Sequence, residues 1–479
     1  MSTGGRRLAA AALMIATALQ AADTLIVNVA LPQLERDLGG GIELGTWVVV
    51  SYLCATAVTA PLAGWLRRRY GAGRLFPLAL TALIATSLLC AAAPSATAMI
   101  AARVLQGAAG GVILPLAQAM LLDITPQERH GRVLGMLGAV LMLGPILAPP
   151  LGGLITDLSS WRAVFLVNLP LGLFSIAGVR RLRYPEDALP PQVVDAVGIV
   201  LLTVAVAALQ LCLEGGVGGS SLHPSKVAAE AAIAAAAIAA IALRARRSRF
   251  TVFRPEIFKD LNFAVAAFYN FVTCAVVFVT LVLLPVLAQE VFDFSATVAG
   301  LTMVPRALVM MLVMLAVGGL MGRIDCRILL CLGWLTMFAG LAILARVEPE
   351  HAFFWLVAGS CVQAVGAGML FTPHSTLAYS TLPQPLRTDA SGLYSLLRQL
   401  GFASGVAVMA TLLQLRIELR HDELKAVVPT ALLDRLAAFL AYRDCFAMMA
   451  VAALACIPGV FLFRAAGAAA LRAGRAPVR

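Results

Sequence analysis

Two charged residues, Asp23 and Arg103, stand inside long apolar stretches of the sequence. On insertion scales an ionisable side chain in the middle of a membrane helix costs about 2.5–3.5 kcal/mol or more, so each needs a reason to be there. Asp23 lies roughly 13 Å, and Arg103 roughly 9 Å, below the outer end of its stretch. An aspartate that is neutral in one state and paired in another can carry a proton across a membrane. A permanent Asp–Arg bridge that holds two helices together is the structural alternative.

Other polar side chains in the apolar stretches could line a substrate cavity: Gln20, Asn28, Gln106, Gln118, Gln210, Gln289 and Arg398. Hydrogen bonds between helices are the favoured explanation of these residues, and also of Arg306, Gln363 and Gln399. The nine Cys form no CxxC pair, and the sequence has no His cluster, HExxH motif or phosphate-binding loop. We therefore expect no metal site, no cofactor and no catalytic site.

Glycine and proline are concentrated in the apolar stretch 132–156, at Gly144, Pro145, Pro149, Gly152 and Gly153. Proline removes a helix hydrogen bond and bends the axis, and glycine allows two helices to approach closely. The pattern is typical of a helix that acts as a gate, with a static kink as the alternative. A basic loop follows the second stretch and contains Gly64, Arg68, Arg69 and Gly71.

The composition explains which elements must position these residues. The chain has 479 residues, of which 61% are hydrophobic and 13% charged, far from the balance of a soluble domain. Apolar runs of about 20 residues, each long enough to span a bilayer, occur fourteen times. They lie at 8–31, 45–66, 74–93, 97–121, 132–156, 162–181, 193–213, 226–243, 263–286, 296–318, 328–346, 351–372, 389–414 and 444–464.

The basic residues predict the orientation. With a cytoplasmic N-terminus, the inner loops collect most of the Arg and Lys, and the even number of spans places the C-terminus in the cytoplasm as well. This distribution also explains the net charge of +11 better than nucleic-acid binding does. Residues 1–22 could be a cleaved signal peptide, but their apolar run continues to Leu31, which makes it long enough to span.

The two halves of the sequence repeat weakly. Gly110 to Pro115 ends the fourth span, and Gly368 to Pro373 ends the twelfth. The repeat predicts an all-α membrane protein with two six-helix bundles around a central site. We expect an N-terminal bundle at 1–185, two inserted helices at 186–250, and a C-terminal bundle at 251–479 with a periplasmic segment at 415–443.

The motifs resemble the fourteen-helix drug:proton antiporters of the EmrB/QacA family, which have the major facilitator fold. The likeness covers almost the whole chain and rests on several segments, namely Asp23–Pro32, Arg103–Gly107, Gly144–Gly153, Trp161–Gly172 and Ser391–Gly401. Three further segments are similar to the EmrB branch: Pro115–Leu121, Leu209–Gly216 and Arg416–Leu424. The resemblance implies that Asp23 couples protons and that Arg103 shapes their path. It also implies a periplasmic adaptor and an outer-membrane channel as partners.

Three positions in two motifs depart from the family pattern. Arg68 stands where the loop motif carries an Asp that helps to lock the inner gate, so the gate here needs other contacts. Ala148 and Pro150 replace a Gly and a small polar residue of the branch, which affects the geometry of the fifth span.

The sequence therefore predicts proton-coupled export of small amphipathic compounds, such as drugs, across the inner membrane by alternating access. An exporter of a dedicated metabolite, for example a fatty acid, a siderophore or an amino acid, would have the same residues. An uptake permease and a membrane enzyme or sensor are the remaining alternatives; the Gly–Pro-rich span argues against the first and the missing catalytic motifs against the second.

Overall fold

The structure is a computed structural model that describes residues 3–39, 41–181, 195–215, 224–247, 255–321, 323–425 and 429–463. In this part of the chain the ordered elements are helices, and the one β-type pairing is an isolated bridge between Met321 and Ile324. The chain divides into two compact units. Unit 1 comprises Met1–Leu209, Ala231–Lys259 and Leu382–Leu396, and unit 2 comprises Gln210–Glu230, Asp260–Thr381 and Leu397–Arg479.

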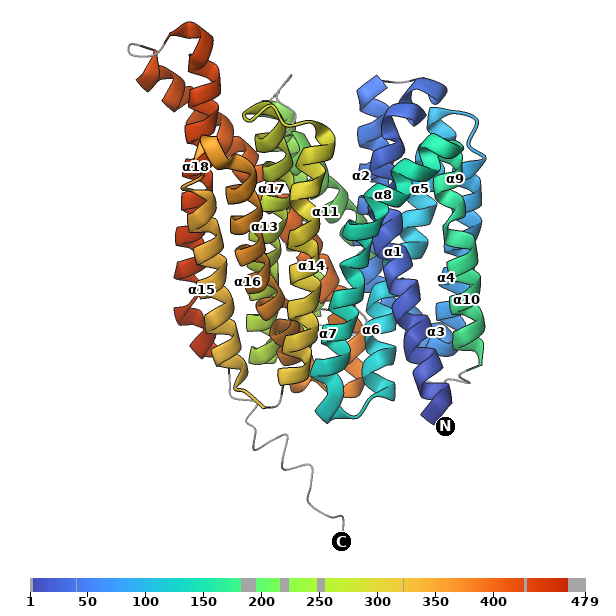
Figure 1. The fold of residues 1–479 in the computed structure, drawn as a ribbon. Coiled ribbons are helices and arrows are strands. Elements are labelled where there is room, and N and C mark those ends of the chain that lie inside the picture. Colours follow the sequence, from blue (N-terminus) through green and yellow to red (C-terminus); the bar gives the residue numbers. More distant parts are fainter. Residues whose placement is uncertain are drawn as a thin grey trace. The chain divides into compact units, whose positions relative to one another are not determined.

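Unit 1 is built mainly from ten helices of the N-terminal part of the sequence (Figure 1). They are α1 (Thr3–Leu38), α2 (Gly41–Thr59), α3 (Ala63–Tyr70), α4 (Ala72–Ala91), α5 (Ala96–Gly111), α6 (Ile113–Ile124), α7 (His130–Leu141), α8 (Leu143–Leu158), α9 (Trp161–Leu166) and α10 (Asn168–Arg180). Short 3-10 turns lie at Ala60–Leu62 and Gln127–Arg129. Within the unit, α1 packs against α8, α10 and α2, and α5 packs against α2 and α4.

Three spans of unit 1 are interrupted at a residue shortly before a proline. The breaks fall at Val112, Met142 and Val167, each three residues before Pro115, Pro145 and Pro170, respectively. A proline has no N–H to donate to the carbonyl four residues earlier, so the helix loses a hydrogen bond at that point. The bent fifth span that the sequence predicts is thus a pair of helices, α7 and α8.

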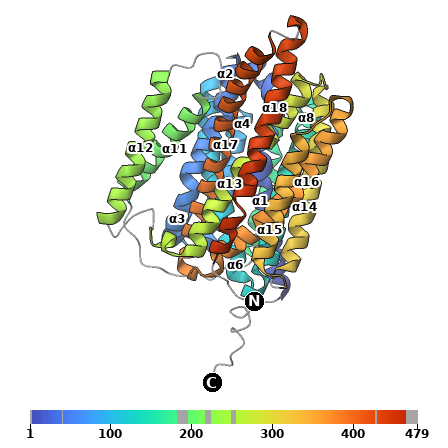
Figure 2. The ribbon, with the colours of Figure 1, turned by 90° about the vertical axis from the view of Figure 1, so that its left-hand side faces the viewer.

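Two further helices come after α10 in the sequence: α11 (Ala196–Gly215) and α12 (Pro224–Arg247). Figure 2 shows both helices. Arg244 of α12 donates to Asp195, just before α11, from Nε at 3.0 Å and from Nη2 at 2.8 Å. This charged contact fixes one end of the pair.

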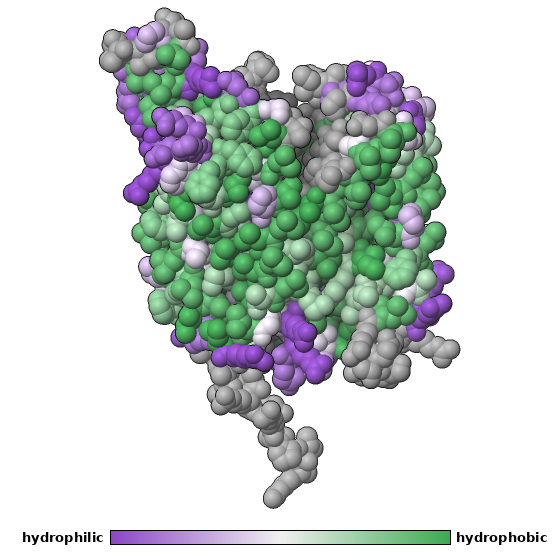
Figure 3. Space-filling model, in the orientation of Figure 1, coloured by the Kyte–Doolittle hydropathy of each residue, from purple (hydrophilic) through white to green (hydrophobic). Residues whose placement is uncertain are grey.

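Unit 2 contains the long helices α13 (Leu261–Glu290), α14 (Ala296–Leu320), α15 (Cys326–Leu344), α16 (Ala352–Ser380) and α18 (Thr430–Ala455), with most of α17 (Arg387–Leu424). Short 3-10 turns lie at Pro349–His351 and Pro458–Leu462 in this unit, and at Pro255–Lys259 and Gln384–Leu386 in unit 1. Helix α16 packs against α15, α14 and α13. Hydrophobic side chains cover the middle of the unit's helices, and hydrophilic ones gather at their ends (Figure 3).

Each of the fourteen predicted spans coincides with one helix or an interrupted pair. In the described part of the chain, eleven helices are long and apolar enough to cross a membrane, and residues 8–24 and 197–209 form shorter apolar helices. The eleven long helices correspond to predicted spans two to six and nine to fourteen, the two shorter ones lie in the first and seventh, and the Ala-rich α12 lies at the eighth. Crossing by all fourteen stays a prediction.

The segment 415–443, predicted to be periplasmic, is mostly helical. Helix α17 continues to Leu424 and α18 begins at Thr430, so the two helices extend beyond their neighbours in unit 2 (Figure 2). Arg420 of α17 links the two helices by donating to Asp444 of α18 from Nε at 2.9 Å and from Nη2 at 3.0 Å.

Candidate functional site

Asp23 lies near the middle of α1, and its side chain is enclosed by unit 1, with 2% of the residue exposed. One carboxylate oxygen, Oδ1, accepts hydrogen bonds from the side-chain amides of Gln106, at 2.9 Å, and Asn168. The other oxygen, Oδ2, is buried and has no hydrogen-bond partner among the described residues. It lies 3.9 Å from Nη1 of Arg103, which is close enough for an ion pair but too far for a good hydrogen bond.

Arg103 on α5 is completely buried. Its Nε donates to the carbonyl of Val48 at 3.1 Å, and its Nη1 donates to Oε1 of Gln106 at 2.8 Å. The guanidinium also lies over the ring of Tyr52 on α2, with 4.2 Å from Cζ to the ring centroid. Tyr52 therefore supports the cation by a cation–π contact, which gains strength when both groups are shielded from water.

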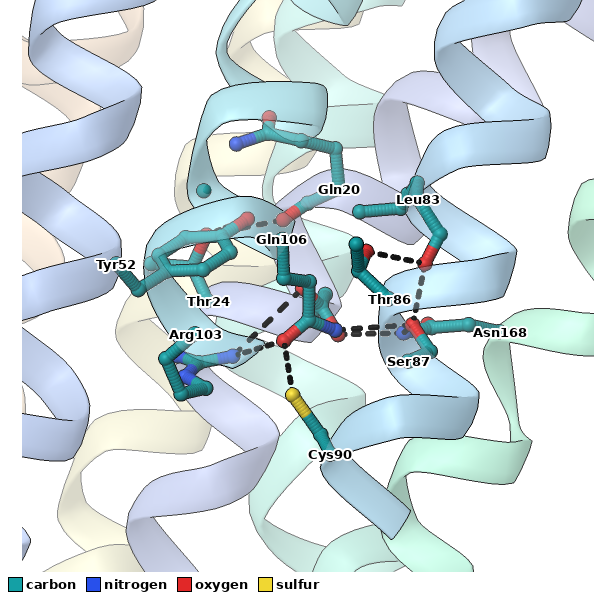
Figure 4. Close-up of polar contacts among 12 residues, drawn as sticks. Gln20, Thr24, Tyr52, Leu83, Thr86, Ser87, Cys90, Arg103, Gln106 and Asn168 are labelled. Carbon is teal, nitrogen blue, oxygen red and sulfur yellow. Dashed lines mark hydrogen bonds and ion pairs between the residues drawn. The ribbon is translucent and has the colours of Figure 1, made fainter. Parts of the chain in front are cut away.

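Helices α4 and α10 complete the site (Figure 4). Ser87 on α4 accepts hydrogen bonds from Gln106 at 2.9 Å and from Asn168 at 2.8 Å, and it donates to the carbonyl of Leu83 at 2.8 Å. The Cys90 thiol lies 3.3 Å from Oε1 of Gln106. Five helices thus converge on one carboxylate, and the amides that hold Oδ1 leave Oδ2 as the atom that can accept a proton.

Close packing between helices makes this convergence possible. A Cβ atom added at Gly107 would collide with the backbone of Tyr52, and one added at Gly144 would come within 2.8 Å of the backbone of Ala21. Glycine at these positions brings α5 against α2, and α8 against α1. The predicted Gly–Pro segment therefore packs against α1 close to Asp23. Gly152 is buried and Gly153 half-buried, whereas the side chains of Pro145 and Pro149 lie outside the described residues.

The predicted cavity residues are divided between several places. Gln106 is central to the site, and Gln20 is buried on α1 one turn before Asp23. Gln118 on α6 accepts a hydrogen bond from Ser391 at 2.9 Å, away from Asp23. In unit 2, Gln289 is exposed and bonds the carbonyl of Pro285 in its own helix, and Arg398 is half-buried on α17. The side chains of Asn28 and Gln210 lie outside the described residues.

The basic loop forms a second polar cluster in unit 1, which we call the α17 clamp: Arg67, Arg68, Asp123, Thr388 and Asp389. Arg67 donates to Asp123 and to Thr388, both at 2.7 Å, and Arg68 pairs with Asp389. Thr388 and Asp389 lie in the first turn of α17, and each is 321 residues from its arginine partner in the sequence.

The neighbours of the α17 clamp show how tightly α17 begins against unit 1. A Cβ at Gly64 would collide with the Asp389 carboxylate, so only glycine fits there. Gly71 ends α3 with a φ of 75°, a backbone conformation that favours glycine. Arg69 is exposed and lies over the Tyr70 ring. Thus Arg68, the departure from the family motif, has a carboxylate partner on α17.

Four residues of the Asp23 site were not among the predicted site residues: Tyr52, Ser87, Cys90 and Asn168. Asn168 stands in a segment that resembles the family, and Tyr52 and Ser87 are polar residues in apolar helices, which is a weak signal on its own. Among the described residues no group of His, Cys, Asp and Glu could hold a metal ion.

The sequence matches the family model of the Major Facilitator Superfamily over residues 13–406. It is 32% identical to the multidrug export protein EmrB of Haemophilus influenzae over 422 residues, which cover 86% of this chain and 81% of that protein. It is 29% identical to the fatty acid resistance protein FarB of Neisseria gonorrhoeae over 418 residues, 85% of this chain and 80% of that protein.

Among solved structures, the human organic anion transporter MFSD10 matches with a TM-score of 0.64 and 15% identity, covering 97% of this chain and 100% of that one. At that identity the likeness concerns the fold alone. The likeness in sequence and the likeness in fold both extend over most of the chain.

Proposed function

Because the chain belongs to the major facilitator superfamily, with EmrB-type multidrug exporters among its relatives, we propose that it exports small amphipathic compounds in exchange for protons. It has the fold predicted for it, it is a multi-pass membrane protein, and it is a transporter rather than an enzyme. The proposal places it in an inner membrane with both termini in the cytoplasm, as the basic residues predict.

One observation carries the proton coupling: a buried carboxylate whose Oδ2 has no hydrogen-bond partner lies beside a buried guanidinium. A proton on Oδ2 makes Asp23 neutral, which removes the charge that balances Arg103. Loss of the proton restores the ion pair. The two protonation states therefore favour different packing of α1 against α5, and this difference is what a transport cycle needs.

The membrane supplies the driving force. One charge that crosses against 100 mV corresponds to about 2.3 kcal/mol, and a pH gradient adds to it. In the proposed cycle Asp23 receives its proton from the periplasm and releases it to the cytoplasm, and a compound moves in the opposite direction.

Helix α17 is divided between the two units, as α11 and α12 also are. Its first residues belong to unit 1 and its remainder, from Leu397, to unit 2. The α17 clamp fixes the unit 1 end by the Arg68–Asp389 pair. We propose that this pair acts as the gate contact where relatives of the family use an Asp in the loop, and that transport requires it to break and form again.

The projecting ends of α17 and α18 are proposed to contact a periplasmic adaptor of the EmrA type, which would connect the exporter to an outer-membrane channel. Charged side chains on these ends support a polar contact, among them Arg416, Arg420, Glu423 and Lys425. Removing residues 415–443 should abolish co-purification with such an adaptor.

Export of a dedicated metabolite is the second candidate. One relative, FarB, is named for fatty acid resistance, so a fatty acid is a specific alternative to drugs. The same cycle at Asp23 would serve either substrate class.

The test is proton movement in everted membrane vesicles that are energised to an acid interior. A panel of lipophilic cations, weak acids and fatty acids is added while the lumenal pH is followed. We expect alkalinisation by wild type and by Glu128→Gln, a control that converts an exposed carboxylate to an amide. Asp23→Asn should give none. An equal response from Asp23→Asn and wild type, at equal protein abundance, would refute the role of Asp23.

A further inference from the structure

Unit 2 also buries an arginine in the middle of a membrane helix. Arg306 lies on α14, ten residues after the helix begins at Ala296, and is 5% exposed. Helices α13 to α16 contain one acidic residue, Glu290, at the exposed C-terminal end of α13. It is thirteen residues from Val277, the point on α13 that Arg306 contacts, which corresponds to about 20 Å along the helix.

The partners of Arg306 are all neutral. Its Nη2 donates to the carbonyl of Val277 at 2.9 Å and to Oε1 of Gln363 at 3.4 Å. Gln363 is oriented by a hydrogen bond from its Nε2 to Thr280 at 2.7 Å. The Nε of Arg306 is buried without a hydrogen-bond partner, and no carboxylate of a described residue pairs with this guanidinium.

A lone buried guanidinium is an unfavourable arrangement. Arginine stays charged in proteins, so it cannot avoid the cost of burial by losing its proton. Carbonyl and amide dipoles compensate only part of that cost, and a buried charge is stabilised by an opposite charge with matching hydrogen bonds. The free donor at Nε is suited to one oxygen of a carboxylate, with which it would form a charge-assisted hydrogen bond.

A second guanidinium lies on a helix that packs against α13. Arg398 on α17 is half-buried. One turn further along α17, a Cβ atom added at Gly401 would lie 2.3 Å from the carbonyl oxygen of Phe271 on α13. Two guanidinium groups of unit 2 therefore come from helices that contact α13, and their charges add in attracting an anion.

Apolar surface adjoins these two cations. Phe278 on α13 follows Val277 directly, and Phe402 on α17 is one turn after Arg398. Both side chains are partly exposed, and their rings contact each other with 4.6 Å between centroids. An alkyl or aromatic tail could pack on this pair while a charged headgroup bonds the arginines.

We propose that Arg306, assisted by Arg398, binds the carboxylate of an amphipathic substrate whose apolar part packs on Phe278 and Phe402. This inference deepens the proposed export function and rests on it for the statement that the ligand is transported. The binding site itself does not depend on proton coupling, because the residues belong to unit 2.

Binding by the full-length protein tests the proposal. The protein is placed in phosphatidylcholine nanodiscs and titrated, below the micelle concentration, with three probes of equal chain length: laurate, dodecanol and dodecyltrimethylammonium. We expect wild type to bind laurate at least tenfold more tightly than the other two. Arg306→Gln should reduce laurate affinity about tenfold and leave dodecanol affinity unchanged. Arg306→Lys, which retains the charge, should keep an intermediate affinity.

Two controls make the result decisive. Arg323→Gln removes an exposed arginine and should bind laurate as wild type does. Unchanged dodecanol binding shows that Arg306→Gln is folded; if that variant does not fold, Arg306→Lys and Arg398→Gln replace it, and each should weaken laurate binding about threefold. Equal laurate affinity in wild type and the Arg306 variants would overturn the proposal, and so would an equal loss for laurate and dodecanol.

Anionic lipid presents a related chemistry, and one further titration separates the two sources. The laurate titration is repeated with phosphatidylglycerol in the nanodisc. Unchanged laurate affinity supports a substrate site. Loss of laurate binding overturns the proposal, because the site then binds the lipid headgroup. Laurate binding without proton movement in vesicles would leave this site standing and reject the antiport. Proton movement in vesicles without Arg306-dependent laurate binding would support the antiport and reject this binding site.

Discussion

The two units each bury an arginine at membrane depth, but they compensate its charge differently. In unit 1, Arg103 has a carboxylate partner in Asp23, together with Gln106 and the ring of Tyr52. In unit 2, Arg306 has the carbonyl of Val277 and the amide of Gln363, and none of the described carboxylates. A glutamine supports the cation in both units, so the main difference is the aspartate.

In the proposed transport cycle, this difference assigns two different tasks to the two units. A carboxylate beside an arginine can change its charge by binding a proton, and the pair can therefore report the proton gradient. A guanidinium with neutral partners keeps one charge in every state and can select a ligand by its sign. Unit 1 is thus suited to exchange protons, and unit 2 to recognise an anionic headgroup.

In the α17 clamp, as around Arg103, arginines of unit 1 are paired with carboxylates. Arg67 is paired with Asp123, and the largely buried Arg68 with Asp389, so the cations in this cluster also have carboxylate partners. The clamp therefore offers a second place to test whether unit 1 depends on charge compensation.

The largest effect is expected from reversing one charge of the clamp. Arg68→Asp places two buried carboxylates side by side and breaks an ion pair, a change worth about 3–5 kcal/mol in buried pairs. We expect transport to fall at least tenfold in the vesicle assay. The double variant Arg68→Asp/Asp389→Arg restores opposite charges and should recover most of the activity.

The neighbouring Arg69 provides the control, because it is exposed and Arg69→Asp makes the same change of charge. It should retain nearly normal transport. If the double variant were as inactive as Arg68→Asp, the pairing of these two side chains would not be the reason for the defect.

Removing each buried arginine should have a smaller effect on the free energy of unfolding, and the sign of this effect should differ between the two units. Arg103→Met leaves Asp23 without its cation and should lower stability by about 3 kcal/mol. Arg306→Met removes a charge that none of the described carboxylates balances, so the free energy of unfolding should stay the same or rise. Thermal denaturation of the two variants in one detergent, with Arg323→Met as the exposed control, measures the contrast. Equal destabilisation by both would remove the distinction between the units.

The sequence predicted the parts of this account that depend on single helices. Apolar length placed most of the spans, and the cost of a buried charge singled out Asp23 and Arg103, whose charged groups lie 3.9 Å apart in the structure. It also drew attention to Arg68. These inferences need only helix rise, hydropathy and the chemistry of one side chain.

The other features of the site depend on how the helices pack against one another, and a single sequence does not give that packing. Ser87 and Asn168 join Asp23 because α4 and α10 face α1, and Asp389 meets Arg68 from 321 residues away in sequence. Arg306 was expected to take part in hydrogen bonds between helices, and it does. That none of the described carboxylates pairs with it emerges only when the side chains around it are known.

The most direct test of the central claim is whether Asp23 gains and loses a proton inside unit 1. Infrared difference spectra between acid and alkaline pH, recorded on the protein in nanodiscs, detect the carbonyl band of a protonated carboxyl group shielded from water. We predict such a band in wild type, Arg306→Gln and Glu128→Gln, and its absence in Asp23→Asn. A band that persists in Asp23→Asn, or no band in wild type at any pH, would contradict the account.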